Sequence, residues 1–225
     1  MITSRDNDKL KLVRKLHERT WRDKLGLFAV EGEDLLAPPG IEPVELLVAG
    51  ETVAAELLAE VSTLAHPPRV IAVYRRDALP TGSRPVTLAL WRVADPGNVG
   101  TLLRAADAFG AAVALSKGCA DPTGPKAVRA SMGAVWRVPV SAFDDAGGTR
   151  VALVPRGGVP LPELELDGDV TLVLGAEREG LPADVLARCD VQASIPQPGE
   201  AESLNVAMAG AIALYEISGR AFGTR

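Results

Sequence analysis

Three glycine-containing turns of this 225-residue chain carry polar side chains whose types and spacing could support chemistry. The first lies in residues 94–110, where we expect Asn98 to cap a helix and Gly100 to let another backbone come close. Arg104 follows within a largely apolar segment, where a guanidinium must find an anion. That anion could be Asp107 or another acidic side chain, or it could be a substrate phosphate held by the planar guanidinium.

The second turn, in residues 170–182, begins where an apolar strand runs into Gly175. This glycine permits close backbone approach to a ligand, and Glu177 could accept hydrogen bonds there. Gly180 and Pro182 follow, and the proline suits the start of a helix. Ordinary helix capping explains the same residues, so this turn alone does not establish a site.

The third turn, in residues 195–216, leads into a helix that is apolar nearly all round as far as Leu214. Ser203 is expected to cap this helix, and Asn205 lies in its first turn. A helix of this kind is buried on every side, within the core or against a second subunit. Asn205 would then need hydrogen-bond partners, either as a structural residue or as part of a site.

The elements around these turns predict an α/β fold. Apolar strands separated by helices indicate a parallel sheet covered on both faces, in which sites collect at the carboxyl ends of strands. The expected strands are residues 86–93, 112–115, 151–154, 170–174 and 191–195, and the expected helices are 99–109, 125–132, 182–188 and 204–218.

A smaller α/β unit is expected before a turn-rich linker at residues 77–85. The domains predicted on either side of this linker are residues 1–80 and 86–225. In the smaller unit we expect a first helix over residues 7–24, strands at 27–30, 44–49 and 70–74, and a helix within 51–64.

Composition excludes several classes of protein. The 47% hydrophobic content argues against disorder, and no apolar run approaches the roughly 20 residues that span a bilayer. The polar N-terminus lacks the apolar core of a secretion signal. Cys119 and Cys189 lie far apart without metal-ligand spacing, so we expect core positions for both, no bound metal, and a reducing cytoplasm.

Charge is distributed unevenly. Residues 1–24 carry eight basic and four acidic side chains, a net charge of +4, which leaves −9 for the rest of a chain whose total is −5. A basic first helix on an acidic body could bind phosphates, or it could be a solvated helix face. If residues 1–24 bind the phosphates of a nucleic acid such as RNA, the side chains expected to contact them are Arg5, Lys9, Lys11, Arg14 and Arg22.

Taken together, the three turns resemble the motifs of the SpoU (TrmH-like) branch of the SPOUT methyltransferases. They read N-x-G-x-x-x-R-x-A-x-x-F-G, G-x-E-x-x-G-L and I-P-x-x-G-x-x-x-S-L-N-V, in the order and spacing of that family. Residues 131–134, 139–140 and 28–32 are also similar to it. The sequence contains no G-x-G-x-x-G or P-loop segment, which argues against a different α/β enzyme that uses a nucleotide cofactor.

The resemblance implies a deep trefoil knot in the C-terminal domain, bound S-adenosylmethionine, and a homodimer formed through that domain, with the site where two subunits meet. It implies polar site residues at Asn98, Arg104, Glu177, Ser203 and Asn205. It implies cofactor contacts at Leu174, Gly175, Ala176, Gly180, Ile195, Pro196, Ser203, Leu204 and Asn205.

This chain departs from the family pattern at three places. Ala207 stands where a serine is common, residues 33–40 interrupt a position where a longer helix is usual, and residues 65–69 resemble a deletion. These differences bear on the choice of RNA more than on the chemistry.

The implied activity is transfer of a methyl group from S-adenosylmethionine to a ribose 2′-hydroxyl of RNA. Ribosomal RNA is favoured over transfer RNA, and a drug-binding site on the ribosome is a further possible target. The alternative from another class is a non-catalytic RNA-binding or ribosome-assembly protein that retains the fold.

The proton of the ribose hydroxyl must leave during the reaction, and neither His17 nor His66 lies in the three turns. Deprotonating Arg104 at pH 7 would cost roughly 7 kcal/mol. A role for Arg104 as a phosphate anchor and electrostatic stabiliser costs less, with Glu177 or a water receiving the proton.

Overall fold

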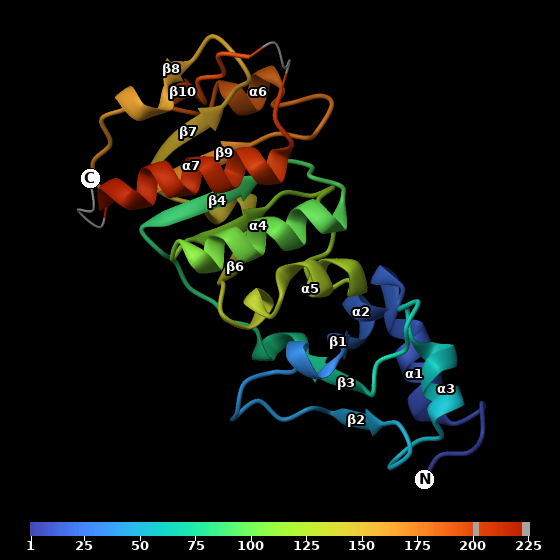
Figure 1. Ribbon diagram of the computed structural model, residues 1–225. Coiled ribbons are helices and arrows are strands. Elements are labelled where there is room, and N and C mark those ends of the chain that lie inside the picture. Colours follow the sequence, from blue (N-terminus) through green and yellow to red (C-terminus); the bar gives the residue numbers. More distant parts are fainter. Residues whose placement is uncertain (200–202, 222–225) are drawn as a thin grey trace.

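The computed structural model describes residues 1–199 and 203–221, which form one large and one small β-sheet with their helices (Figure 1). Positions 200–202 of the third turn and 222–225 of the predicted larger domain lie outside the described residues. Within the described part, no helix is long and apolar enough to cross a membrane.

The large sheet has seven strands in the order β6-β5-β4-β9-β7-β10-β8, and every pairing is parallel. The strands β4 and β9, in the middle of the sheet, are buried along their whole length. This is expected of continuous apolar runs in a sheet that is covered on both faces. The predicted parallel sheet is therefore confirmed. Its strands are β4 (Val86–Leu90), β5 (Ala112–Leu115), β6 (Val140–Ala142), β7 (Thr149–Leu153), β8 (Val159–Pro160), β9 (Val170–Leu174) and β10 (Val191–Ser194). The sequence prediction missed β6 and β8, which are too short for a periodic pattern.

Four α-helices accompany this sheet: α4 (Pro96–Ala108), α5 (Pro125–Ser131), α6 (Ala183–Leu186) and α7 (Val206–Ala221). Figure 1 shows α4 and α7 side by side along the sheet. Gly100 lets α4 approach the backbone of α5 at Ala127, as the sequence predicted for this glycine. Gly210 lets α7 pack closely against α4, because a Cβ at this position would overlap the Leu102 side chain of α4.

The small sheet is antiparallel, in the order β1-β3-β2. Its elements are α1 (Asp8–Leu16), α2 (Arg19–Leu25), β1 (Leu27–Glu31), β2 (Glu45–Val48), α3 (Ala55–Val61) and β3 (Val70–Arg75). Short 3-10 segments η1 to η5 complete the chain at Glu33–Leu35, Arg76–Ala78, Ala134–Trp136, Phe143–Asp145 and Leu161–Glu163.

The single first helix expected over residues 7–24 is wrong, because α1 and α2 are separate helices. Arg22 explains the break: its Nη1 donates to the carbonyl oxygens of Leu16 and His17, both at 2.8 Å. Carbonyls at a helix C-terminus lack partners within the helix, and a guanidinium can satisfy them.

The same guanidinium joins the small unit to the large one. Arg22 Nε donates to Asp121 Oδ2 at 2.7 Å, and Arg76 Nη2 donates to Asp121 Oδ1 at 2.6 Å. Arg22 is only 4% exposed. Its expected contact with RNA is therefore wrong, because the side chain is buried and already paired.

An apolar cluster continues this junction. The rings of Phe28, Tyr74 and Trp136 pack together, and Trp136 Nε1 donates to the Leu35 carbonyl at 2.9 Å. Trp136 belongs to the unit with the large sheet, whereas Phe28, Tyr74 and Leu35 belong to the unit with the small sheet. This apolar core therefore spans the boundary between the two units.

Candidate active site

The three turns meet through their polar side chains. Asn98 Nδ2 donates to Glu177 Oε1 at 3.0 Å, and Asn205 Nδ2 donates to Asn98 Oδ1 at 3.2 Å. These residues come from the segments that follow β4, β9 and β10, whose carboxyl ends share one edge of the parallel sheet. The structure therefore joins one polar residue from each predicted motif in a single network, the Asn98–Glu177–Asn205 network.

Asn98 does not cap α4, which corrects the sequence prediction. The capping residue is Asp95, whose Oδ1 accepts from the Asn98 backbone N–H at 3.0 Å. A hydrogen bond from Lys126, together with the capped backbone N–H, holds the pKa of Asp95 below its ordinary value. Because Asp95 caps the helix, the Asn98 side chain is free to face the other two loops.

The second turn is closed by its own backbone. Ala176 and Gly180 exchange N–H···O hydrogen bonds of 3.2 and 3.0 Å, and Gly180 has a φ of +66°. A Cβ on Gly175 would overlap the backbone of Gly180. The close approach that Gly175 permits is thus to Gly180, a neighbour in its own loop that the sequence prediction did not identify.

Asn205, and not Ser203, caps α7. Its Oδ1 accepts from the backbone N–H groups of Ala207 and Met208 at 2.9 and 3.3 Å. The expectation that Ser203 caps this helix is wrong because α7 begins at Val206, directly after Asn205. One asparagine side chain thus begins the helix and joins the polar network.

A cavity of about 530 Å³ opens beside this network, and we call it the three-loop cavity. It is lined by residues 153–155 at the end of β7, residues 174–181 at the end of β9, Ile195 and Gln197 after β10, and residues 203–206 and 209 at the start of α7. Eight of the nine predicted cofactor residues line it: Leu174, Gly175, Ala176, Gly180, Ile195, Ser203, Leu204 and Asn205. Pro196 is the exception, and it is not among the lining residues.

The sequence prediction missed Gln197 and the end of β7. The Oε1 atom of Gln197 is buried and has no hydrogen-bond partner among the described residues. A buried carbonyl oxygen without a partner costs about 1–3 kcal/mol, so a ligand or water that donates to it would be favoured here. The rule that sites collect at strand ends could have found residues 153–155, whereas no sequence signal marks Gln197.

Arg104 does not line the three-loop cavity of its own chain, contrary to the expected arrangement with Gly175 and Asn205. Arg104 lies six residues after Asn98 on α4. At about 100° per residue, the two side chains point in directions roughly 120° apart around the helix axis. Its side chain is exposed rather than buried, and no partner for it lies among the described residues. Asp107, its possible structural partner, instead binds Arg137.

The remaining predicted RNA contacts are paired, and they are exposed except for Arg14, which is partly buried. Arg5 and Arg14 lie against Glu60, at 2.7 and 4.0 Å, Lys9 contacts Glu45 at 2.6 Å, and Lys11 lies 3.7 Å from Asp8. These carboxylates reduce the positive charge that the four side chains offer to a phosphate. Neither histidine lines the three-loop cavity.

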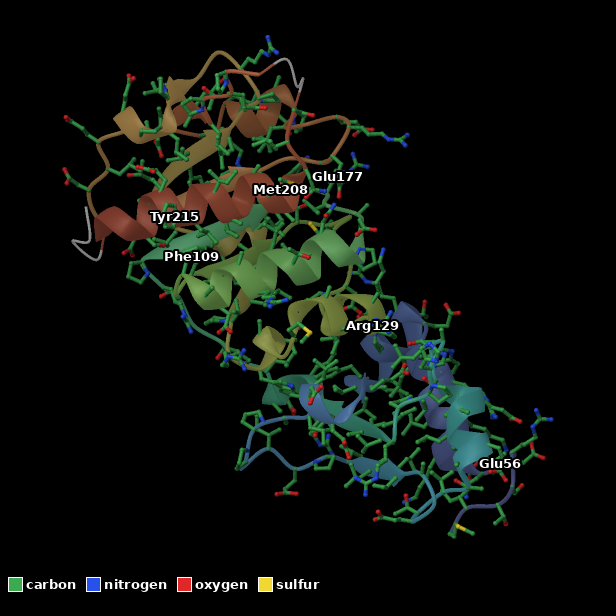
Figure 2. All side chains as sticks on the ribbon, in the orientation of Figure 1. Glu56, Phe109, Arg129, Glu177, Met208 and Tyr215 are labelled. Atoms are coloured by element: carbon green, nitrogen blue, oxygen red, sulfur yellow. The ribbon has the colours of Figure 1, made fainter. Side chains whose placement is uncertain are left out.

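One face of α7 is exposed in the single chain, so the expectation of burial on every side within the core is wrong. Met208, Ile212 and Tyr215 are 56%, 41% and 52% exposed. They are spaced by four and three residues and thus share one helix face. Figure 2 shows Tyr215 next to Phe109, and the two ring centroids are 6.1 Å apart.

Comparison with known proteins identifies a family. The model of the SpoU rRNA Methylase family matches residues 85–215. The 23S rRNA (guanosine(2553)-2′-O)-methyltransferase RlmP of Bacillus subtilis is 33% identical, over 97% of this chain and 99% of its own.

Two solved structures share the whole fold. The AdoMet-bound rRNA methyltransferase of Sinorhizobium meliloti superposes with a TM-score of 0.84 at 29% identity, covering 98% of this chain and 97% of its own. The SpoU methyltransferase AviRb of Streptomyces viridochromogenes, in complex with AdoMet, superposes with a TM-score of 0.82 at 26% identity. This match covers 97% of this chain and 100% of its own.

Proposed function

The chain belongs to the SpoU rRNA methylase family, and from this we propose that it transfers a methyl group from S-adenosylmethionine to a ribose 2′-hydroxyl of ribosomal RNA. The Asn98–Glu177–Asn205 network carries this proposal. It joins polar residues of all three motifs, two of which, Glu177 and Asn205, line one cavity, and folding alone does not require this arrangement. The reaction would take place in the cytoplasm, where ribosomes are assembled.

The three-loop cavity fits S-adenosylmethionine in size and chemistry. Its volume lies within the roughly 300–1,000 Å³ of small-molecule sites. Leu153, Leu174 and Ile195 provide apolar walls, and Glu177 provides negative charge for a cationic ligand. Gln197 offers an acceptor that has no partner among the described residues. Backbone groups around residues 174–175, 195 and 204 would hold the adenine and methionine portions.

When bound, S-adenosylmethionine supplies an electrophilic methyl group. The ribose 2′-oxygen would form a bond to this methyl carbon as the carbon–sulfur bond breaks, and the hydroxyl proton would have to leave. Asn98 holds Oε1 of Glu177, which leaves Oε2 to receive that proton directly or through a water. Ser203 lines the cavity, whereas Ala207, at the position where a serine is common, is buried and is not among the lining residues.

We place Arg104 at the substrate phosphate, and a homodimer is needed to bring it there. The exposed apolar face of α7, formed by Met208, Ile212 and Tyr215, is suited to a second copy of the chain. A dimer through this face would place the site where two subunits meet, so that Arg104 of one chain could serve the cavity of the other.

Two further features of the family are part of the proposal. The small unit, within residues 1–80, would bind RNA, and residues 86–225 would carry out methyl transfer. A trefoil knot is supported by the way Ile195, Gln197 and residues 203–205 share a cavity with residues 153–155 and 174–181. Mechanical unfolding from both ends should then give a chain that is shorter than the extended length of 225 residues.

The decisive experiment supplies labelled S-adenosylmethionine and ribosomal subunits that lack modification, and then maps 2′-O-methyl positions. We expect one or a few labelled riboses, and loss of labelling in Asn205→Ala. If calorimetry shows binding of S-adenosylmethionine but no ribose is methylated, the result would favour a non-catalytic binding protein. If neither cofactor binding nor methylation is detected, the proposal would be overturned.

A further inference from the structure

The first 24 residues contain eight basic side chains, and six of them lie within 4.0 Å of a carboxylate. The paired residues are Arg5, Lys9, Lys11, Arg14, Arg19 and Arg22. Lys15 and Lys24 differ, because neither forms an ion pair with a carboxylate of the described residues. These two lysines are therefore the basic side chains of this segment that have no carboxylate within 4.0 Å among the described residues.

Both of these lysines lie against the same aromatic ring. The Nζ atoms of Lys15 and Lys24 are 4.8 and 5.1 Å from the centroid of the Trp21 ring. Both lysines are exposed, and Trp21 is half-buried. The corner between α1 and α2 thus presents a half-buried indole with two exposed ammonium groups, neither of which forms an ion pair with a carboxylate of the described residues.

We propose that Lys15, Trp21 and Lys24 form a nucleotide platform that holds an unpaired stretch of the RNA substrate. A base would stack on the indole, and the lysines would move from the ring to the flanking phosphates. This inference rests on the proposed function, since it assigns the RNA contact of the same enzyme to particular residues.

An indole with two lysines favours RNA over an acidic peptide. Phosphates and carboxylates both attract ammonium groups, but unstacked bases also offer flat π-faces that gain from an aromatic surface. A folded duplex offers no such free base. The platform therefore suits a single-stranded loop or bulge.

The platform is held at a fixed position relative to the site. Arg19, on the same helix as Trp21, donates from Nη1 to the Cys119 carbonyl at 3.0 Å. Arg22 is buried against Asp121, just before α5. Helix α5 in turn packs on α4, which carries Asn98 (Figure 1). RNA bound at the platform would thus be positioned with respect to the Asn98–Glu177–Asn205 network.

The test measures binding of a fluorescein-labelled 12-nucleotide single-stranded RNA by anisotropy across a salt series. Lys15→Gln/Lys24→Gln is compared with Lys9→Gln/Lys11→Gln, which removes the same charge from residues that are paired with carboxylates. Trp21→Ala tests stacking, and Trp21→Phe serves as its conservative counterpart. Circular dichroism and cofactor calorimetry confirm that each variant is folded.

We expect the platform double variant to bind RNA about tenfold more weakly, with a salt slope reduced by about 1–2. The Lys9/Lys11 variant should lose at most about twofold. Trp21→Ala should weaken binding about tenfold, and Trp21→Phe should retain most of the affinity. In the wild type, RNA should also quench a share of the tryptophan fluorescence that is missing in Trp21→Phe.

Equal losses in the two lysine variants, or an unchanged affinity in Trp21→Ala, would overturn the platform. A larger loss in the Lys9/Lys11 variant would favour the RNA surface predicted from sequence. A polyglutamate peptide of equal charge that binds as tightly as the RNA would indicate a protein partner, which also contradicts the proposal. Failure of the wild type to methylate RNA would instead count against the proposed function.

Discussion

Asn98 and Arg104 lie on the same helix and both match the family motif, yet only Asn98 contacts the other two loops. We predict that Arg104→Ala lowers turnover at least 100-fold while S-adenosylhomocysteine affinity stays within about twofold. The physical reason is that Arg104 does not line the three-loop cavity and would act on the RNA phosphate. Calorimetry and single-turnover methylation measure the two effects separately.

Arg104→Lys is the matched control for charge. Lysine keeps the positive charge but lacks the planar fork, so it should restore only part of the activity. Full activity in Arg104→Ala would remove this side chain from the mechanism.

Gln197 allows a second prediction at the residue scale. Replacing it with leucine removes the buried Oε1 that has no partner among the described residues. We expect S-adenosylmethionine affinity to fall roughly threefold to tenfold, the value of one net hydrogen bond. The melting temperature of the cofactor-free protein should not fall, because the substitution leaves no described residue without its hydrogen-bond partner. A lower melting temperature with unchanged affinity would assign Gln197 a purely structural role.

At the scale of elements, the close packing of α4 on α5 depends on Gly100. Alanine is the better helix former by up to about 1 kcal/mol, which alone would stabilise α4. A Cβ at this position, however, would overlap the Ala127 carbonyl and lie 2.6 Å from Ala130 Cβ. We therefore predict that Gly100→Ala lowers the free energy of unfolding by about 1–3 kcal/mol in urea titrations.

Gly147→Ala is the control for this substitution. No atom lies within 4 Å of a Cβ at Gly147, and its φ is not positive. Its free energy of unfolding should stay within about 0.5 kcal/mol of the wild type. Equal effects at both glycines would contradict the packing argument.

At the scale of the whole molecule, Asp121 connects the two units through Arg22 and Arg76. Asp121→Ala leaves the Arg22 guanidinium buried without its carboxylate, which should cost about 3–5 kcal/mol of unfolding free energy. The exposed Asp144–Arg188 pair provides the control, since Asp144→Ala should cost less than about 1 kcal/mol. A small effect at Asp121 would show that the apolar cluster alone joins the units.

The same carboxylate predicts a pH dependence. Burial acts to raise the pKa of Asp121, but hydrogen bonds from Thr123 and Arg22 and the charge of Arg76 outweigh it, so the pKa lies below its ordinary value. An unfolded aspartate titrates near pH 3.9, so the stabilisation is present above about pH 4 and is lost as pH falls through the folded pKa. Wild-type stability should therefore fall more steeply below pH 4 than that of Asp121→Asn.

The proposed dimer makes a further prediction for the whole molecule. Ile212 lies in the middle of the exposed apolar face of α7, so Ile212→Glu would place a charge within the subunit contact. We expect light scattering to show twice the chain mass for the wild type and a single chain mass for the variant. Methylation should be lost with the dimer. A wild type that is monomeric and active would exclude a site shared between subunits.

The sequence by itself determined the elements and the motifs. The apolar runs of β4 and β9 predict buried parallel strands because such runs are local, and the glycines and asparagines of the three turns can be identified in the same way. The order and spacing of these turns also identified the family. The sequence did not reveal the break between α1 and α2, because a residue several positions away satisfies the carbonyls at that break.

Only the tertiary structure decided which of these residues meet. Asn98 is 79 residues from Glu177 and 107 from Asn205, so no local pattern could pair them. The burial of Arg22 depends on Asp121, 99 residues away, and the unpaired oxygen of Gln197 depends on how the chain surrounds it. Periodicity tells which way a side chain faces on its own element, whereas its partners depend on elements brought together from elsewhere in the chain.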